Sequence, residues 1–157
     1  MRSVAAVVND WQLSGIYTAR SGGALTITQP SGIGASRPDV VPGEPLVLDD
    51  YEETYVRLNT AAYTRVPVYS RTNATVRAGN YIVGMVRATP NWNLNLSLAK
   101  NFQIGSTQRL QIRIDAFNAL NHHSLGNPNT NITSADFGRI TSIGGTRTAQ
   151  VGAKFNF

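Results

Sequence analysis

The residues of this chain that could hold a metal ion lie in two short segments. His122 and His123 are the only histidines, and they are adjacent. Neighbouring residues on an extended backbone point to opposite faces, so the pair cannot easily share a metal ion. An acidic patch could offer oxygen ligands to Ca²⁺, but it lacks the spacing of a calcium loop. The patch consists of Asp49, Asp50, Glu52 and Glu53. We therefore predict no metal site and no cofactor.

Side chains suited to catalysis are equally sparse. The chain contains no cysteine, which excludes a thiolate nucleophile, a thiolate metal site and a disulfide scaffold. No Ser, His and Asp arrangement stands out, and paired carboxylates occur only in the acidic patch. A loop over 31–36 contains two glycines, but it lacks the third glycine of a dinucleotide turn and the Gly-Lys of a phosphate loop. We predict that the protein is not an enzyme.

The positive charge of the chain does not form a nucleic-acid surface. The formal net charge is +5, yet the basic residues are scattered singly instead of clustered, so we predict no nucleic-acid partner. Charged residues make up 15% of the chain, below the roughly 25% of soluble domains, which fits a surface that faces an apolar medium. No segment approaches the ~18 consecutive apolar residues of a membrane-spanning helix.

Alternating apolar and polar residues predict strands, because strand side chains repeat with a period of two. The clearest example is 92–101, where Trp92 and the three following leucines share one face. Further alternation predicts strands near 4–20, 24–29, 108–119 and 147–157, with long external loops over 30–91 and 120–146.

The predicted connections follow the order short, long, short, long. Gly22 and Gly23 supply the first tight turn, which would join the first two strands as a hairpin, and Gly105 lies in the second. This order is typical of membrane barrels with short periplasmic turns and long external loops. If both short turns face the periplasm, the last strand ends there with Phe157. Strands of about ten residues are long enough to cross the ~25 Å apolar band.

The two faces of these strands predict different surroundings. Polar residues of one face are candidates to line the lumen or merely to hydrate the wall: Asn93, Asn95, Gln111, Arg113, Asp115 and Lys154. Aromatic residues are candidates for interfacial girdles: Trp11, Tyr17, Trp92, Phe102 and Phe155. The last strand resembles the terminal strand of outer-membrane barrels, where a final Phe after alternating apolar residues is read by the barrel-assembly machinery. The corresponding residues are Val151, Ala153, Phe155 and Phe157.

Five segments of the chain form a recognisable set: 11–22 (WQLSGIYTARSG), 37–43 (RPDVVPG), 91–102 (NWNLNLSLAKNF), 115–122 (DAFNALNH) and 137–142 (FGRITS). Together they resemble the C-terminal barrel region of TonB-dependent outer-membrane receptors, especially the Oar-like branch. The resemblance implies a large barrel with an N-terminal plug, and transport of a bulky substrate driven through TonB by the inner-membrane proton gradient. It also implies outer-membrane lipid, the assembly machinery and the TonB system as partners.

The chain departs from that family in its extent. Such transporters have about 22 strands and a plugged lumen, whereas this sequence offers five or six strands and no plug, TonB box or signal sequence. We therefore expect an all-β fold, an antiparallel meander that forms the C-terminal part of a transmembrane β-barrel, as one partial-barrel domain over 1–157.

Two other interpretations stay open. A self-contained outer-membrane barrel of about eight strands, with a structural or adhesive role, would need weak strands within 4–8 and 75–87. A secreted carbohydrate-binding β-sandwich would remain in water. The sequence names neither a substrate nor an oligomeric state.

Overall fold

The structure is a computed structural model that describes residues 9–157, and it confirms the all-β fold class. Positions 4–8 of the first predicted strand lie outside the described residues. The elements are β1 (Trp11–Arg20), β2 (Gln29–Ser31), β3 (Gly34–Ser36), β4 (Asp39–Val40), α2 (Tyr51–Thr54), the 3-10 helix η1 (Thr60–Ala62), β5 (Tyr63–Thr64), β6 (Asn91–Gln103), β7 (Arg109–Phe117), β8 (Ser124–Leu125), β9 (Ile143–Gly144) and β10 (Thr148–Asn156).

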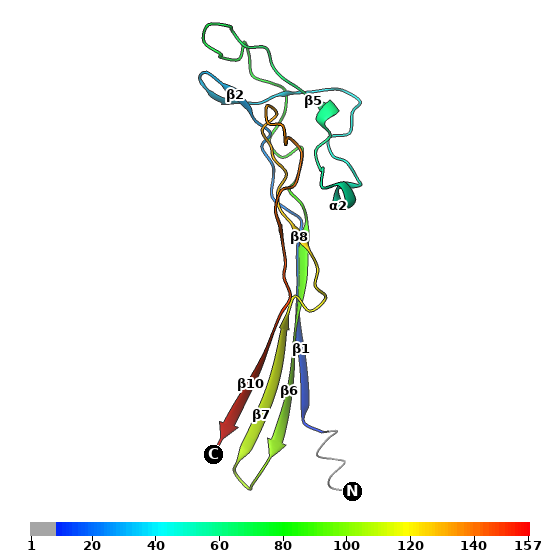
Figure 1. Cartoon of the computed structure of the whole chain (residues 1–157), viewed down its shortest axis with the longest axis vertical. Coiled ribbons are helices and arrows are strands. Elements are labelled where there is room, and N and C mark those ends of the chain that lie inside the picture. Colours follow the sequence, from blue (N-terminus) through cyan, green and yellow to red (C-terminus); the bar gives the residue numbers. More distant parts are fainter. Residues whose placement is uncertain (1–8) are drawn as a thin grey trace. The chain divides into compact units, whose positions relative to one another are not determined.

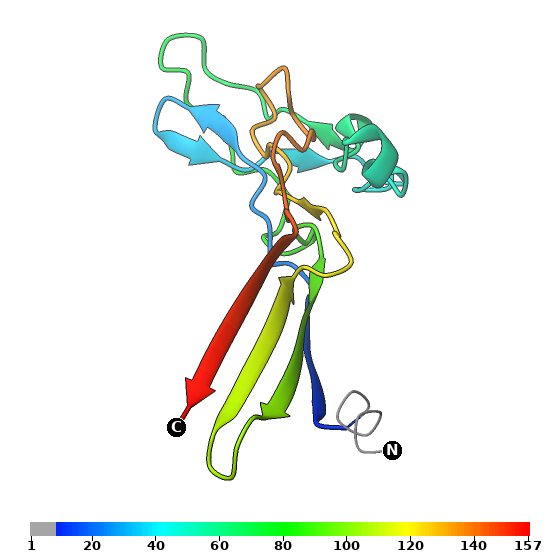
Figure 2. The same cartoon turned by 60° about the horizontal axis from the view of Figure 1, so that its bottom comes forward.

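The predicted domain 1–157 comprises two compact units. The sheet unit contains 9–19, Trp92–Ser124 and Gly145–Phe157, and the loop unit contains Arg20–Asn91 and Leu125–Gly144. The four long strands belong to the sheet unit, in the order β1-β6-β7-β10 (Figures 1 and 2).

All neighbouring strands of this sheet run antiparallel. In the β6–β7 pair Leu98 lies opposite Ile114, and in the β7–β10 pair Ile114 lies opposite Val151. β1 and β6 are also antiparallel, because the Asn101 N–H donates to the Asp10 carbonyl whereas Gly15, further along β1, lies against Leu96, earlier in β6. Because alternate residues share a face, these pairs align the apolar rows into one apolar face and the polar rows into one polar face.

The order of the strands corrects the predicted connections. The neighbour of β1 is β6, not a strand over 24–29, so 21–90 forms a single long connection and the predicted hairpin at Gly22 and Gly23 is wrong. The β6–β7 turn and Phe157 lie at the same end of the sheet, as Figure 2 shows, and both long connections leave from the other end. The first turn therefore does not share the side of the second.

The segment 24–29 alternates for a different reason. Leu25 and Ile27 are buried in the hydrophobic core of the loop unit, and the Leu25 N–H donates to the Val86 carbonyl at 2.9 Å. The preceding Gly22 has φ +73°, and a Cβ there would lie 2.2 Å from the Ala88 carbonyl oxygen. Gly22 thus allows two backbones to approach each other, and it does not begin a hairpin.

The core of the loop unit is small, aromatic and well packed. Tyr81 is fully buried and its hydroxyl donates to the Leu25 carbonyl at 2.8 Å. Tyr63 packs edge-on against Phe137, with 5.4 Å between ring centroids. Next to Phe137, Gly138 has φ +83° and its carbonyl accepts the N–H groups of two residues, Arg57 and Leu58. The predicted external loops therefore fold around a core of their own.

Candidate functional site

The polar face of the sheet carries every residue predicted to face a lumen. Cross-strand partners place Asp115 opposite Ser97 on one side and Gln150 on the other. The period of two then assigns the same face to Asn93, Asn95, Gln111, Arg113 and Lys154. The structure thus brings together residues from β6, β7 and β10.

Asp115 is the centre of a polar cluster on this face. It is buried, with 7% of its surface exposed, and its carboxylate accepts from Nε and Nη2 of Arg113 at 2.8 Å each. The Gln150 amide donates to the same oxygen at 3.2 Å, and the Ser97 hydroxyl also bonds to Asp115. A buried carboxylate is stable only when it is paired and hydrogen-bonded, and three strands supply these partners.

The other residues predicted to face the lumen differ in whether their side chains find hydrogen-bond partners. The Asn95 amide oxygen accepts the Asn118 N–H at 2.9 Å, and the Gln111 amide donates to Asn101 at 3.0 Å. The Asn93 amide oxygen is buried without a hydrogen-bond partner among the described residues. Asn118 adopts φ +51°, and its own side chain bonds the 118–122 turn, which ends β7.

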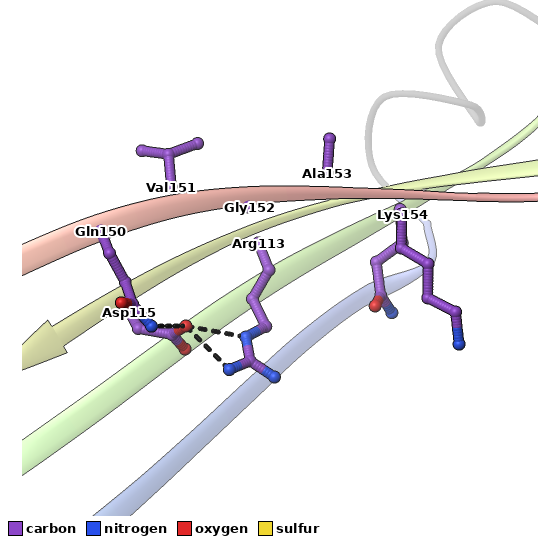
Figure 3. A pocket seen from close by; sticks show the side chains of 8 residues that line it. Arg113, Asp115, Gln150, Val151, Gly152, Ala153 and Lys154 are labelled. Carbon is purple, nitrogen blue, oxygen red and sulfur yellow. Dashed lines mark hydrogen bonds and ion pairs between the residues drawn. The ribbon is translucent and has the colours of Figure 1, made fainter.

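Two shallow hollows lie on the polar face, on either side of Arg113 and Asp115. The larger encloses about 400 Å³ between β7 and β10, around Gly152. Figure 3 shows Gln150, Arg113 and Lys154 on one side of the β10 backbone and Val151 and Ala153 on the other. The smaller encloses about 250 Å³ over β1, β6 and β7. Ile16 and Phe117 line the smaller hollow and are large apolar exceptions on this face.

The opposite, apolar face is most exposed on the edge strands β1 and β10 and partly exposed on β6 and β7. Leu13 is 72% exposed and Val151 is 73% exposed, whereas apolar side chains of soluble domains are mostly buried. Of the predicted barrel-assembly residues, Val151, Ala153 and Phe155 follow this face of β10, and Phe157 comes directly after the strand ends and stacks on Phe155 with 6.3 Å between ring centroids. An exposed apolar face of this extent requires an apolar neighbour, such as lipid or another protein surface.

Aromatic residues stand at both ends of the apolar face. Tyr17 and Trp92 lie 6.0 Å apart at one end, where the Trp92 ring also stacks on His122 at 4.0 Å. Trp11 and Phe102 lie at the other end. Because rings of Trp and Tyr favour the interface between lipid and water, this arrangement suits a strand that crosses a bilayer.

The sequence analysis did not predict which face of the sheet carries Lys100. Lys100 interrupts the apolar row of β6, and its spacing of two residues from Leu98 could have predicted this position. Its ammonium donates to the Asn9 carbonyl and lies 5.2 Å from the Trp11 ring and 5.6 Å from the Phe102 ring. Long basic side chains reach an interface in this way while their methylene groups stay apolar.

The residues considered for metal binding are not members of the polar cluster. His122 stacks on Trp92 at the end of the apolar face. The acidic patch surrounds the four-residue helix α2 in the loop unit. Elsewhere in that unit, Asp39 accepts two hydrogen bonds from Arg77 at 2.8 and 2.6 Å. These bonds, together with the Asn80 N–H and the positive charge of Arg77, lower the pKa of Asp39.

Comparison with known proteins identifies the type of sheet. A family profile described as an outer membrane beta barrel domain matches residues 1–150. The chain belongs to this family. No curated protein and no solved structure matches it. Membership of the outer-membrane barrel family places the chain in the outer membrane, which disagrees with a secreted β-sandwich. Among residues 9–157 no helix is long and apolar enough to cross a membrane.

Proposed function

We propose that this outer-membrane barrel domain is the C-terminal barrel portion of a TonB-dependent receptor that transports a substrate and catalyses no reaction. The observation that carries the proposal is the set of five receptor-like segments. Three of them lie on the sheet: 11–22 contains β1, 91–102 coincides with β6, and 115–122 covers the end of β7 together with its turn. The likeness therefore includes the wall of the barrel as well as its loops.

The edges of the sheet support a barrel larger than four strands. In the described part of the chain β1 pairs only with β6, and β10 pairs only with β7. Unpaired backbone groups in lipid cost several kcal/mol each, so spanning sheets close into barrels. We propose that further strands of a longer receptor cover both edges, and that the polar face then lines the lumen.

The alternative of a small self-contained barrel has less support. It needs a strand within 75–87, but the structure has only isolated bridges there, Val68 with Thr75 and Ala24 with Arg87. The other required segment, 4–8, lies outside the described residues.

The arrangement of connections suits ligand capture from outside. Both long connections leave the sheet at the end opposite Phe157. Loops on a rigid barrel commonly carry the binding residues. In the proposed mechanism these loops capture the substrate, and TonB then rearranges the plug. Outer-membrane lipid surrounds the apolar face, and the assembly machinery recognises the terminal strand.

The test is capture of TonB by the full-length protein in living cells. An epitope tag inserted beside Ile33, which is 81% exposed at the tip of the β2–β3 hairpin, leaves the terminal strand unchanged. After formaldehyde treatment, purification through the tag should recover TonB, and dissipating the proton gradient should stop substrate accumulation. Absence of TonB, while a known receptor in the same cells captures it, would contradict the proposal.

A further inference from the structure

A hollow in the loop unit opens where several of its segments meet. It encloses about 620 Å³ between the segments 29–32 and 65–68 and the residues Asn73 and Thr133. All of these residues belong to the loop unit, and none of them lies on the polar face of the sheet. Small-molecule sites commonly enclose about 300–1,000 Å³. The hollow is therefore large enough to hold a ligand of its own.

The most deeply buried lining residues, Gln29 and Val66, are fixed to each other. The Gln29 amide donates to the Val66 carbonyl at 2.7 Å and accepts the Val66 N–H at 2.8 Å. Gln29 is 3% exposed and Val66 is 1% exposed. Because the amide of Gln29 bonds the backbone, it shapes the hollow instead of binding a ligand. A preformed site of this kind loses little entropy when a ligand binds.

Gly32 fixes one side of the hollow by bringing two hairpins together. β2 and β3 form one hairpin, and the chain over 67–76 forms a second. The Gly32 N–H donates to the Asn73 carbonyl at 2.8 Å, and a Cβ at Gly32 would lie 1.8 Å from the Thr72 carbonyl oxygen. Only glycine allows this approach of the two backbones. The hairpins thus hold the lining residues in fixed positions.

Most of the lining side chains are apolar. Pro30, Val66, Pro67 and Val68 line the hollow, and Val68 is 43% exposed. A ligand with an apolar body gains free energy when it removes such side chains from water. A small sugar would instead leave hydroxyl groups without partners against these residues, which costs free energy. The lining therefore favours an apolar body.

Arg65 is the single charged residue among those that line the hollow. The ion pairs within residues 9–157 involve Arg77 and Arg113, and they leave Arg65 without a carboxylate. No Asp or Glu occurs in 29–36 or in 65–76, so the local charge attracts an anion. A guanidinium binds a carboxylate through two parallel hydrogen bonds. One cation matches the single charge of a carboxylate better than the nearly double charge of a phosphate group.

We propose that this hollow binds a small amphipathic carboxylic acid. Its carboxylate pairs with Arg65, and its apolar body lies against Val66 and Val68. As the substrate class of the barrel, this ligand deepens the transport proposal and rests on it. Binding at the hollow itself requires neither TonB nor transport.

Saturation-transfer NMR on the full-length protein in lipid nanodiscs tests the proposal. The probes are octanoate, benzoate and phenylacetate, and each is compared with its neutral primary amide. The amide keeps the apolar body but loses the charge, so only the carboxylate can form an ion pair with Arg65. At least one carboxylate should bind, and its amide should bind at least tenfold more weakly. Empty nanodiscs measure the binding to lipid alone.

Four variants locate the binding site. Arg65→Gln should weaken carboxylate binding at least tenfold, whereas Arg71→Gln should leave it unchanged, because Arg71 is exposed in the same unit but does not line the hollow. Val68→Trp should block binding because the indole fills the hollow. Val76→Trp is its control, at a valine that is 42% exposed and lies outside the lining. Since all four positions are exposed, the variants should reach the membrane in normal amounts.

Four results would each overturn the proposal. They are no carboxylate binding above that of empty nanodiscs, an amide that binds as tightly as its carboxylate, equal affinities of Arg65→Gln and Arg71→Gln, and equal affinities of Val68→Trp and Val76→Trp. Failure here is distinguishable from failure of the transport proposal. TonB capture without carboxylate binding rejects this ligand class alone, and carboxylate binding without TonB capture rejects the receptor alone.

Discussion

The sheet unit and the loop unit place the same kinds of residue in opposite surroundings. In the sheet, Leu13 and Val151 are more than two thirds exposed, whereas Ile27 and Leu58 of the loop unit are fully buried. The loop unit thus has a core that excludes water, while the sheet presents its apolar side chains outward. The difference shows that the sheet depends on lipid as its apolar partner, and that the loop unit depends on its own side chains.

The largest expected effect breaks the loop unit. Leu58→Ala removes a fully buried side chain and should destabilise that unit by about 2–5 kcal/mol. Hydrogen exchange on the full-length protein in vesicles should show faster exchange at the core amides of the loop unit and unchanged exchange in β7. Leu13→Ala, at an exposed position of β1, is the control. Equal losses from the two variants would mean that the loop unit has no core of its own.

A charge on the apolar face should destabilise the sheet in lipid. Ile114→Arg, in the middle of β7, should lower the free energy of unfolding from lipid vesicles by about 2–4 kcal/mol, the cost of Arg near the bilayer midplane. Ser14→Arg lies on the polar face and should cost much less. Denaturant titration measures both. A larger loss in Ser14→Arg would reverse the assignment of the two faces.

Gln29 provides a more selective way to weaken the loop unit. Its buried amide donates to the Val66 carbonyl at 2.7 Å and accepts the Val66 N–H at 2.8 Å. Gln29→Ala leaves both backbone groups without these partners, which should cost about 1–3 kcal/mol. Limited proteolysis should then cleave near Val66 sooner, and Gln12→Ala on exposed β1 should change nothing. Unchanged cleavage would show that water replaces the amide.

The smallest expected effect is a response to acid at Asp39. Arg77 lowers the pKa of Asp39 in the folded protein below its ordinary value of 3.8, so the pair stabilises the loop unit at any pH above 3.8. As pH falls through the lowered pKa, this contribution is lost. The Asn80 N–H donates to Asp39 at 3.1 Å, so its protection against hydrogen exchange, relative to the intrinsic rate at each pH, should fall below pH 3.8. In Asp39→Asn this pH-dependent loss of protection should disappear, and its persistence would assign the effect elsewhere.

The sequence located the long strands of the sheet because alternation is a local property. The strand predicted over 92–101 is observed as Asn91–Gln103, and the one over 108–119 as Arg109–Phe117. The last differs by one residue at each end, since β10 is Thr148–Asn156. The polar candidates followed from the same period, because counting in twos places Arg113 and Asp115 together.

Alternation could not tell which apolar partner a segment meets. Leu25 and Ile27 repeat with the same period as β10, yet they fill the core of the loop unit through contacts distant in sequence, such as that with Val86. The hollow around Gly152 likewise could not be found from β10 alone, because only the strand register shows that Arg113 lies opposite Gly152. The burial of Leu25 and Ile27 and the neighbour of Gly152 depend on contacts between segments distant in sequence, which the pattern of one segment does not predict.

A single-cysteine scan of β7 from Leu110 to Phe117, in a chain that contains no native cysteine, tests the central claim most directly. Nitroxide labels on the full-length protein in lipid would report collisions with lipid-soluble oxygen and with a water-soluble relaxation agent. Collisions with oxygen should dominate for labels at 110, 112, 114 and 116. Collisions with the water-soluble agent should dominate at the positions between them, if the agent can enter the space on the polar face. Equal oxygen accessibility at every position, or the opposite alternation, would contradict a sheet that faces lipid with its apolar side.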